Sequence, residues 1–176
     1  IDQWFDRVTQ DLTDDQRADL KRKFSSADHV NKAEEKIKQM AYDVSDHFNK
    51  NWKGTHFKGQ LTAPNKETAI KFKKYFDEFG IVSTEVLISP PDTREGHEDP
   101  TAETTDEVQK FWKRMMDLYG NDEVYNEKII EKFLDSENPE IIIVVDKLLT
   151  GFDAPRNTVL YITRSLKEHT LLQAIA

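Results

Sequence analysis

Apolar residues recur at two different spacings along this chain. Within residues 1–58 they return every three or four positions, as at Ile37, Met40 and Val44. That spacing is typical of helices with one buried face. It predicts helices over about residues 16–24 and 30–49, and the Ser-Ser-Ala-Asp sequence at 25–28 predicts a break between them. We therefore expect a helical N-terminal segment over residues 1–58.

From residue 59 to 176 the pattern changes to short apolar runs alternating with helical segments. Asn65 is a good helix N-cap, and Gly80 is placed to end the helix that follows. Helices are also expected at 106–118, at 125–133 and from 169 onward, and strands at 58–63, 81–88, 140–145 and 158–162. This order predicts an α/β fold with an open, mostly parallel sheet and helices on both faces. In such sheets functional residues gather at the carboxyl ends of the strands.

Composition narrows the class of protein. A chain of 176 residues with 37% hydrophobic and 33% charged residues suits one soluble α/β domain. No apolar run approaches the roughly 20 residues of a membrane span. The absence of cysteine excludes disulfides and thiolate metal sites and fits the cytoplasm. The net charge of −8 does not favour tight nucleic-acid binding by this chain alone.

Candidate chemistry follows the apolar strand at 141–145. The loop after it carries Thr150, Gly151 and Asp153, and then Pro155. Gly151 would let the backbone approach a phosphate, and the Thr150 hydroxyl can donate a hydrogen bond to a phosphate oxygen. Asp153 can accept from a ribose hydroxyl or orient an arginine. The same residues could also form an ordinary turn after a strand.

The sequence Leu-Thr-Gly-Phe-Asp-Ala-Pro at 149–155 resembles motif V of superfamily 2 helicases and translocases. This stretch is similar in sequence to motif V of the motor (R, HsdR-like) subunits of type I restriction enzymes. The short strand before Asn65 lies where motif IV belongs, and residues 171–176 lie where motif VI begins. The resemblance covers residues 59–176 and implies the second RecA-like motor lobe, a three-layer α/β fold. We expect the chain to be a segment of a longer protein, and we expect this segment to end inside motif VI.

The resemblance also implies roles for individual residues. Thr150 and Gly151 would contact the DNA backbone, with Thr62 as a weaker candidate. Asp153 would lie at the nucleotide edge, and Gln173 would face the γ-phosphate of ATP. No Gly-x-x-x-x-Gly-Lys-Ser/Thr loop occurs in the sequence. ATP and Mg²⁺ would therefore be bound mainly by a first RecA-like lobe, and this chain alone is expected to be inactive.

The implied parent protein translocates and cleaves double-stranded DNA with ATP, together with the methylation and specificity subunits of a restriction complex. Two alternatives stay open. One is a non-catalytic RecA-like scaffold, which would also lack the phosphate loop. The other is the second lobe of a different superfamily 2 helicase.

Other polar clusters favour structural roles. The basic and aromatic stretch at 50–58 could follow a nucleic-acid strand, but we expect a linker with Trp52 and Phe57 packed on the domain. The lysines of the helix after Asn65, Lys66 among them, are expected to form its solvated face. The five histidines show no metal-ligand spacing, so no metal site is predicted.

Overall fold

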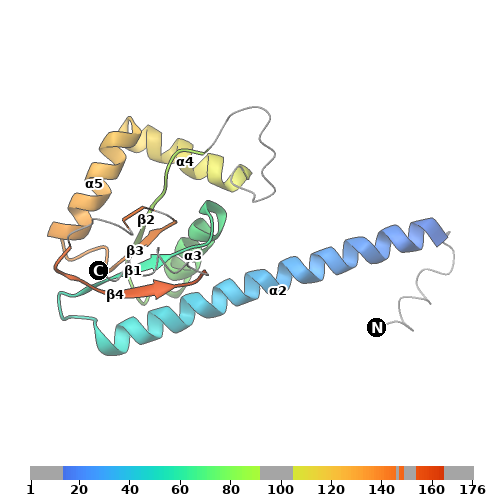
Figure 1. Ribbon diagram of the computed structural model, residues 1–176, viewed down its shortest axis with the longest axis horizontal. Coiled ribbons are helices and arrows are strands. Elements are labelled where there is room, and N and C mark those ends of the chain that lie inside the picture. Colours follow the sequence, from blue (N-terminus) through green and yellow to red (C-terminus); the bar gives the residue numbers. More distant parts are fainter. Residues whose placement is uncertain (1–13, 92–104, 146, 149–153, 165–176) are drawn as a thin grey trace. The chain divides into compact units, whose positions relative to one another are not determined.

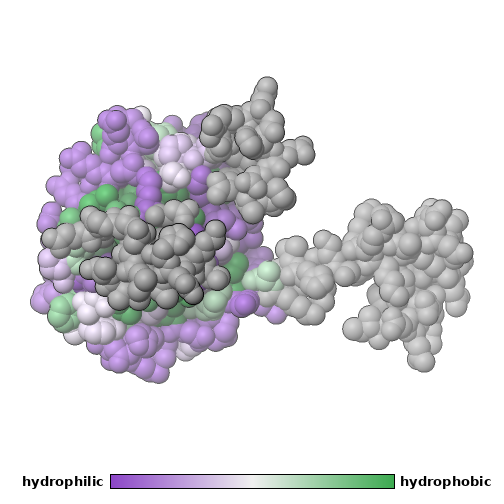
Figure 2. Space-filling view, viewed as in Figure 1, coloured by the Kyte–Doolittle hydropathy of each residue, from purple (hydrophilic) through white to green (hydrophobic). Residues whose placement is uncertain are grey.

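The structure is a computed structural model that describes residues 14–91, 105–145, 147–148 and 154–164. The chain divides into two compact units, residues 1–37 and 38–176, and the second unit contains the whole described sheet. Its elements are labelled in Figure 1. Hydrophilic residues cover much of the face of this unit that Figure 2 shows, as the charged composition requires.

The first described element is one helix, α2, from Asp14 to Asn51. The predicted break at residues 25–28 is therefore wrong. Residues 14–51 contain neither glycine nor proline, and each serine in a helix interior costs only about half a kcal/mol relative to alanine. Two serines are too weak a signal to end a helix of this length.

Four strands form one parallel sheet in the order β2-β3-β1-β4. Their bounds are Lys58–Thr62 for β1, Thr84–Leu87 for β2, Ile141–Val144 for β3 and Asn157–Ile162 for β4. The predicted α/β class with a parallel sheet is confirmed. All residues of the two central strands, β1 and β3, are buried. Continuous burial explains why β3 reads as an unbroken apolar run.

Helices cover both faces of this sheet (Figure 1). The helices after β1 are α3 (Lys66–Phe79), α4 (Asp106–Tyr119) and α5 (Asp122–Asp135). On one face, the carboxyl-terminal part of α2 meets β4 through His47 and Tyr161 and meets α3 through Tyr42 and Phe79. On the other face, α5 contacts the sheet, as where Phe133 lies below the Lys58 ammonium. The result is a three-layer domain.

Helix α3 begins and ends where its sequence predicts. The Asn65 side chain accepts a hydrogen bond from the Thr68 amide at 2.8 Å, which caps the first turn. Gly80 has φ 62°, and its amide donates to the Phe76 carbonyl, which closes the last turn. Both predicted caps are confirmed. They fix the length of the helix that leads out from the carboxyl end of β1.

Tyr125 ties α5 to the edge strand β2. Its side chain is fully buried, and its hydroxyl donates to the Val86 carbonyl at 2.5 Å. Burial raises the pKa of this phenol above its usual range, so the hydroxyl stays a donor.

We expect Tyr125→Phe to lower the free energy of unfolding by about 1–2 kcal/mol, because the buried Val86 carbonyl loses its partner. Urea unfolding measures the effect. Tyr42→Phe, at a half-exposed ring, should change the same value by less than about 0.5 kcal/mol.

Candidate functional site

The carboxyl ends of β1 and β3 lie side by side in the centre of the sheet. The Ala63 amide, just beyond β1, donates to the Val144 carbonyl at the end of β3 at 2.8 Å. From here the chain continues toward β2 on one side and toward β4 on the other. Parallel sheets bind ligands where neighbouring strands lead off in opposite directions. The carboxyl edge of the sheet, at β1 and β3, is therefore the candidate ligand-binding site.

The loop that was singled out in the sequence leaves β3 at this point. Thr150, Gly151 and Asp153 lie outside the described residues, and so does Gln173. Their predicted roles stay predictions. The residues on either side of the loop are described: Leu148 precedes it, and Ala154 follows it. The backbone N–H of Asn157 donates to the Ala154 carbonyl at 2.8 Å, which forms a turn that leads the chain into β4.

Gln60 joins the two ends of this loop. It is a β1 residue whose side chain is only 2% exposed. Its Nε2 donates to the Leu148 carbonyl at 3.2 Å, and its Oε1 accepts from Asn157 Nδ2 at 3.0 Å. Sequence reasoning missed this residue. The available signal was a glutamine in the middle of a short predicted strand.

Thr62, the weaker DNA-contact candidate, lies at the carboxyl end of β1 and is fully buried. Its hydroxyl donates to the Tyr161 carbonyl at 3.3 Å. Its own carbonyl accepts from the Thr163 amide at 3.2 Å and from the Thr163 hydroxyl at 2.6 Å. In this arrangement the Thr62 hydroxyl bonds within the sheet, and its role in DNA contact stays a prediction.

Two lysines lie near the carboxyl edge. Lys66, at the start of α3, is only 5% exposed, and its Nζ donates to the Pro90 carbonyl at 3.0 Å. The prediction that Lys66 belongs to a solvated helix face is therefore wrong, since it sits at the first turn against the loop after β2. Lys147 Nζ donates to Asn126 Oδ1 at 2.6 Å. Burial lowers the pKa of Lys147, and the charge of Lys66 lowers it further, while Asp122 opposes both. Positive charge at this edge suits an anionic ligand.

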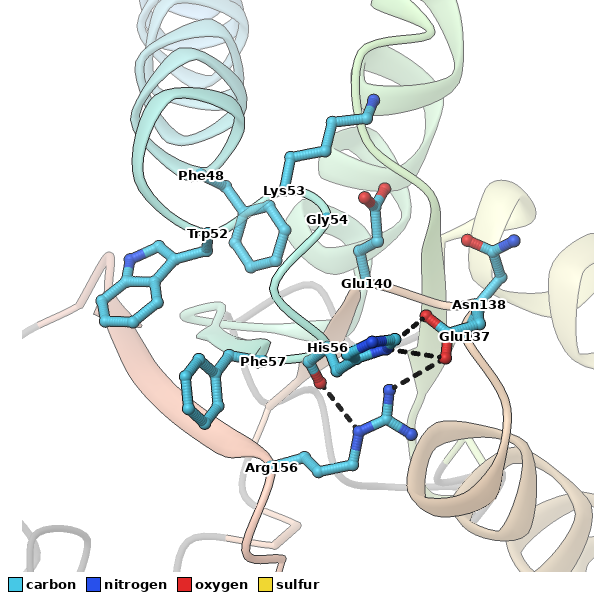
Figure 3. A pocket seen from close by; sticks show the side chains of 10 residues that line it. All are labelled: Phe48, Trp52, Lys53, Gly54, His56, Phe57, Glu137, Asn138, Glu140 and Arg156. Atoms are coloured by element: carbon cyan, nitrogen blue, oxygen red, sulfur yellow. Dashed lines mark hydrogen bonds and ion pairs between the residues drawn. The ribbon is translucent and has the colours of Figure 1, made fainter.

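A pocket of about 270 Å³ lies at the opposite edge, where the chain enters β1, β3 and β4 (Figure 3). The His56 ring meets the Glu137 carboxylate at 3.0 Å, and Arg156 lies 3.6 Å from the same carboxylate. Arg156 also donates to the His56 carbonyl at 2.7 Å. These side chains bond one another, so the cluster is explained by the joining of three chain segments.

The basic and aromatic stretch at 50–58 borders this pocket. Trp52 and Phe57 meet edge to face with their ring centroids 5.9 Å apart, but Phe57 remains 45% exposed. The expected packing of the two rings on the domain is thus only partly realised. Lys58 is buried, and its Nζ donates to the Pro139 carbonyl at 2.8 Å. Lys53 donates to the Ile81 carbonyl.

Among the described residues, no group of three or more His, Asp or Glu side chains is arranged to hold a metal ion. None of the helices described is both long enough and apolar enough to cross a membrane.

Comparison with known proteins adds a family. Residues 4–176 match the family model described as type I restriction enzyme subunit R domain 3. A Methanocaldococcus jannaschii protein assigned as the type I restriction enzyme MjaVIIIP endonuclease subunit is 34% identical over 154 residues, which are 82% of this chain and 14% of the relative. The MjaVIIP subunit of that organism is 32% identical over 184 residues, 100% of this chain and 16% of the relative. The HindI endonuclease subunit of Haemophilus influenzae is 36% identical over 77 residues, 43% of this chain and 6% of the relative.

Proposed function

Since the chain belongs to the family of type I restriction enzyme R subunits, we propose that it forms the second RecA-like lobe of an ATP-driven, DNA-translocating and DNA-cleaving subunit. The relatives named above are endonuclease subunits, and the chain spans about one sixth of their length. Translocation, cleavage and assembly with methylation and specificity subunits in the cytoplasm are therefore proposals about a larger protein.

The observation that supports this proposal is the position of the carboxyl end of β3, from which the loop follows. The first residues of this loop leave the sheet beside the carboxyl end of β1, at the point where the two central strands lead off in opposite directions. The Thr-Gly-x-Asp sequence follows β3 in the chain, and its hydroxyl, glycine and carboxylate are groups suited to binding phosphates and ribose at such an edge. In our proposal Thr150 and Gly151 contact the backbone of double-stranded DNA, and Asp153 and Gln173 face ATP. Lys66 and Lys147 add positive charge near the same edge.

The lobe would contribute to ATP hydrolysis without holding most of the nucleotide. The sequence lacks a glycine-rich phosphate loop, so ATP and Mg²⁺ would be bound mainly by a first lobe. Closure of two lobes around a nucleotide is a general way to couple its hydrolysis to movement. The bound nucleotide supplies the phosphoryl chemistry, while this chain supplies groups that orient and stabilise charge across the interface.

Asp153→Ala in the intact subunit, assembled with its partner subunits, tests the proposal. We expect DNA-dependent ATP hydrolysis to fall by about 100-fold, the usual effect of removing one preorganised polar group from such a site. Specific DNA binding without ATP should stay within about twofold. Asp135→Ala is the matched control, because Asp135 is an exposed aspartate at the end of α5. Unchanged ATP hydrolysis in Asp153→Ala would contradict the motor proposal and favour the scaffold alternative.

A further inference from the structure

Gln60 is the residue of β1 that has an amide side chain, and it lies in the middle of that strand. Its neighbour Gly59 faces Val159, Tyr161 and Ile141 on the α2 side of the sheet. Because side chains alternate along a strand, Gln60 points to the opposite face, where α5 packs. A polar group buried there is unfavourable unless both its donor and its acceptor are bonded.

Both requirements are met by residues that flank the loop after β3. Leu148 supplies the acceptor and Asn157 supplies the donor, at 3.2 Å and 3.0 Å. One rigid amide therefore connects the chain just before residues 149–153 with the start of β4 just after them. The side-chain amide of glutamine offers a donor and an acceptor a fixed distance apart. Glutamate would only accept, and leucine would do neither.

The backbone conformation of Leu148 also requires stabilising contacts from other residues. Leu148 has φ 60°, a left-handed conformation that leucine rarely adopts. Such a conformation persists only when surrounding contacts hold it, and Gln60 bonds the carbonyl of this residue. On the other side, Asn157 Oδ1 is buried and accepts no hydrogen bond within the described ranges. The Gln60 bond is thus the side-chain contact that fixes the Asn157 amide.

We infer that Gln60 is a positioning residue: its hydrogen bonds hold Leu148 and Asn157, the described residues on either side of residues 149–153, and thereby support the proposed action of Thr150, Gly151 and Asp153. The expected effect of Gln60 on activity rests on the proposed function, whereas its role in holding Leu148 and Asn157 is independent of that function. Gln60 would act on DNA or ATP only through the loop, because its side chain is buried and its amide bonds Leu148 and Asn157.

Hydrogen exchange tests the geometric part. In Gln60→Leu, a peptide spanning residues 146–157 should exchange its amide protons about tenfold faster than in the native protein. A peptide within α5, residues 122–135, should exchange at the native rate. The matched control is Thr84→Val, which changes a buried polar residue of β2 whose hydroxyl has no hydrogen-bond partner within the described residues. Equal exchange of residues 146–157 in Gln60→Leu and native protein would overturn the inference.

Kinetics of the intact, assembled enzyme test the functional part. We expect Gln60→Leu to lower kcat for DNA-dependent ATP hydrolysis by about tenfold, with KM for ATP within twofold. Gln60→Glu should behave similarly, because it loses the donor to Leu148. A general loss of folded protein would instead reduce the active fraction and would not spare α5 in the exchange experiment.

A milder variant covers the case in which Gln60→Leu fails to fold. Asn157→Ser removes one of the two bonds at a partly exposed position and should give a smaller loss of kcat, about threefold. Asp153→Ala in the same assay separates the two proposals. If Asp153→Ala abolishes activity and both Gln60 variants keep native kcat, the inference about Gln60 is wrong. If Asp153→Ala keeps activity, the proposed function is wrong, and the exchange result still decides the geometric inference.

Discussion

Replacing Lys58 with methionine is expected to flatten the dependence of the free energy of unfolding on pH between about 8 and 10.5. Lys58 is only 1% exposed. Burial is the main cause that lowers its pKa from 10.5 to about 8, and the Arg156 charge lowers it further. Hydrogen bonding to Pro139 and the nearby Phe133 ring do not fully offset this cost.

The direction of the pH effect follows from the two pKa values. Between pH 8 and 10.5 the unfolded chain holds the Lys58 proton while the folded chain releases it. The unfolded state then binds more protons, so stability rises with pH across this window. Below pH 8 the cost is fully present, and lowering the pKa from 10.5 to about 8 corresponds to at most about 3–4 kcal/mol. Methionine keeps the apolar stem and removes the charge.

Urea unfolding at pH 7.5 and pH 10 measures this effect. The free energy of unfolding of Lys58→Met minus that of the native protein should be largest at pH 7.5 and should fall by about 2–3 kcal/mol toward pH 10. Lys110→Met gives the baseline for removing a lysine, because Lys110 is exposed on α4. If both variants change with pH in the same way, the buried ammonium is not the cause.

Replacing Gly59 with valine is expected to lower the free energy of unfolding by about 3 kcal/mol, the upper end for overfilling a packed core. Valine is ordinarily favoured over glycine in a strand by up to about 1 kcal/mol. Here a Cβ atom at Gly59 would lie 3.1 Å from Val159 Cγ1, 3.2 Å from Tyr161 Cε2 and 3.4 Å from Ile141 Cγ1. Three side chains from both neighbouring strands close the space, so the steric cost exceeds the gain in strand propensity.

Thermal and urea unfolding of a small series check this reasoning. Gly59→Ala should lose less stability than Gly59→Val, and adding Val159→Ala should recover part of the loss, because it removes the closest contact. Thr158→Val, at an exposed position of β4, is the control and should change stability by less than about 0.5 kcal/mol. A Gly59→Val protein as stable as the native one would show that the strands separate without cost.

Local signals in the sequence predicted much of this fold. Asn65 and Gly80 bound α3 because caps depend on residues only a few positions apart. The apolar run at 141–145 predicted a buried central strand, since both faces of β3 are covered. The serines at 25 and 26 misled because they resemble a turn but cost little in a long helix.

Features that depend on distant segments could not be predicted from the sequence. Gln60 and Leu148 are separated by 88 positions, and no local pattern links them. Lys66 is buried by the loop after β2, which the spacing of α3 cannot reveal. The roles of Thr150, Gly151 and Asp153 were predicted from the resemblance at 149–155, whereas physical reasoning about these residues alone favoured an ordinary turn.

The order of strands in the sheet has a consequence for synthesis on the ribosome. β1 is an early strand, yet its two neighbours are made about 80 and 100 residues later, as the pairs Gly59–Ile141 and Gly59–Val159 show. At about 5–20 residues per second, the emerging chain carries an unpaired β1 for roughly 4–20 seconds. Long-range pairing of this kind also slows folding. The nascent chain therefore presents, with both edges open, a strand whose residues are all buried in the folded domain, and during that interval binding by a chaperone would have the greatest effect on yield.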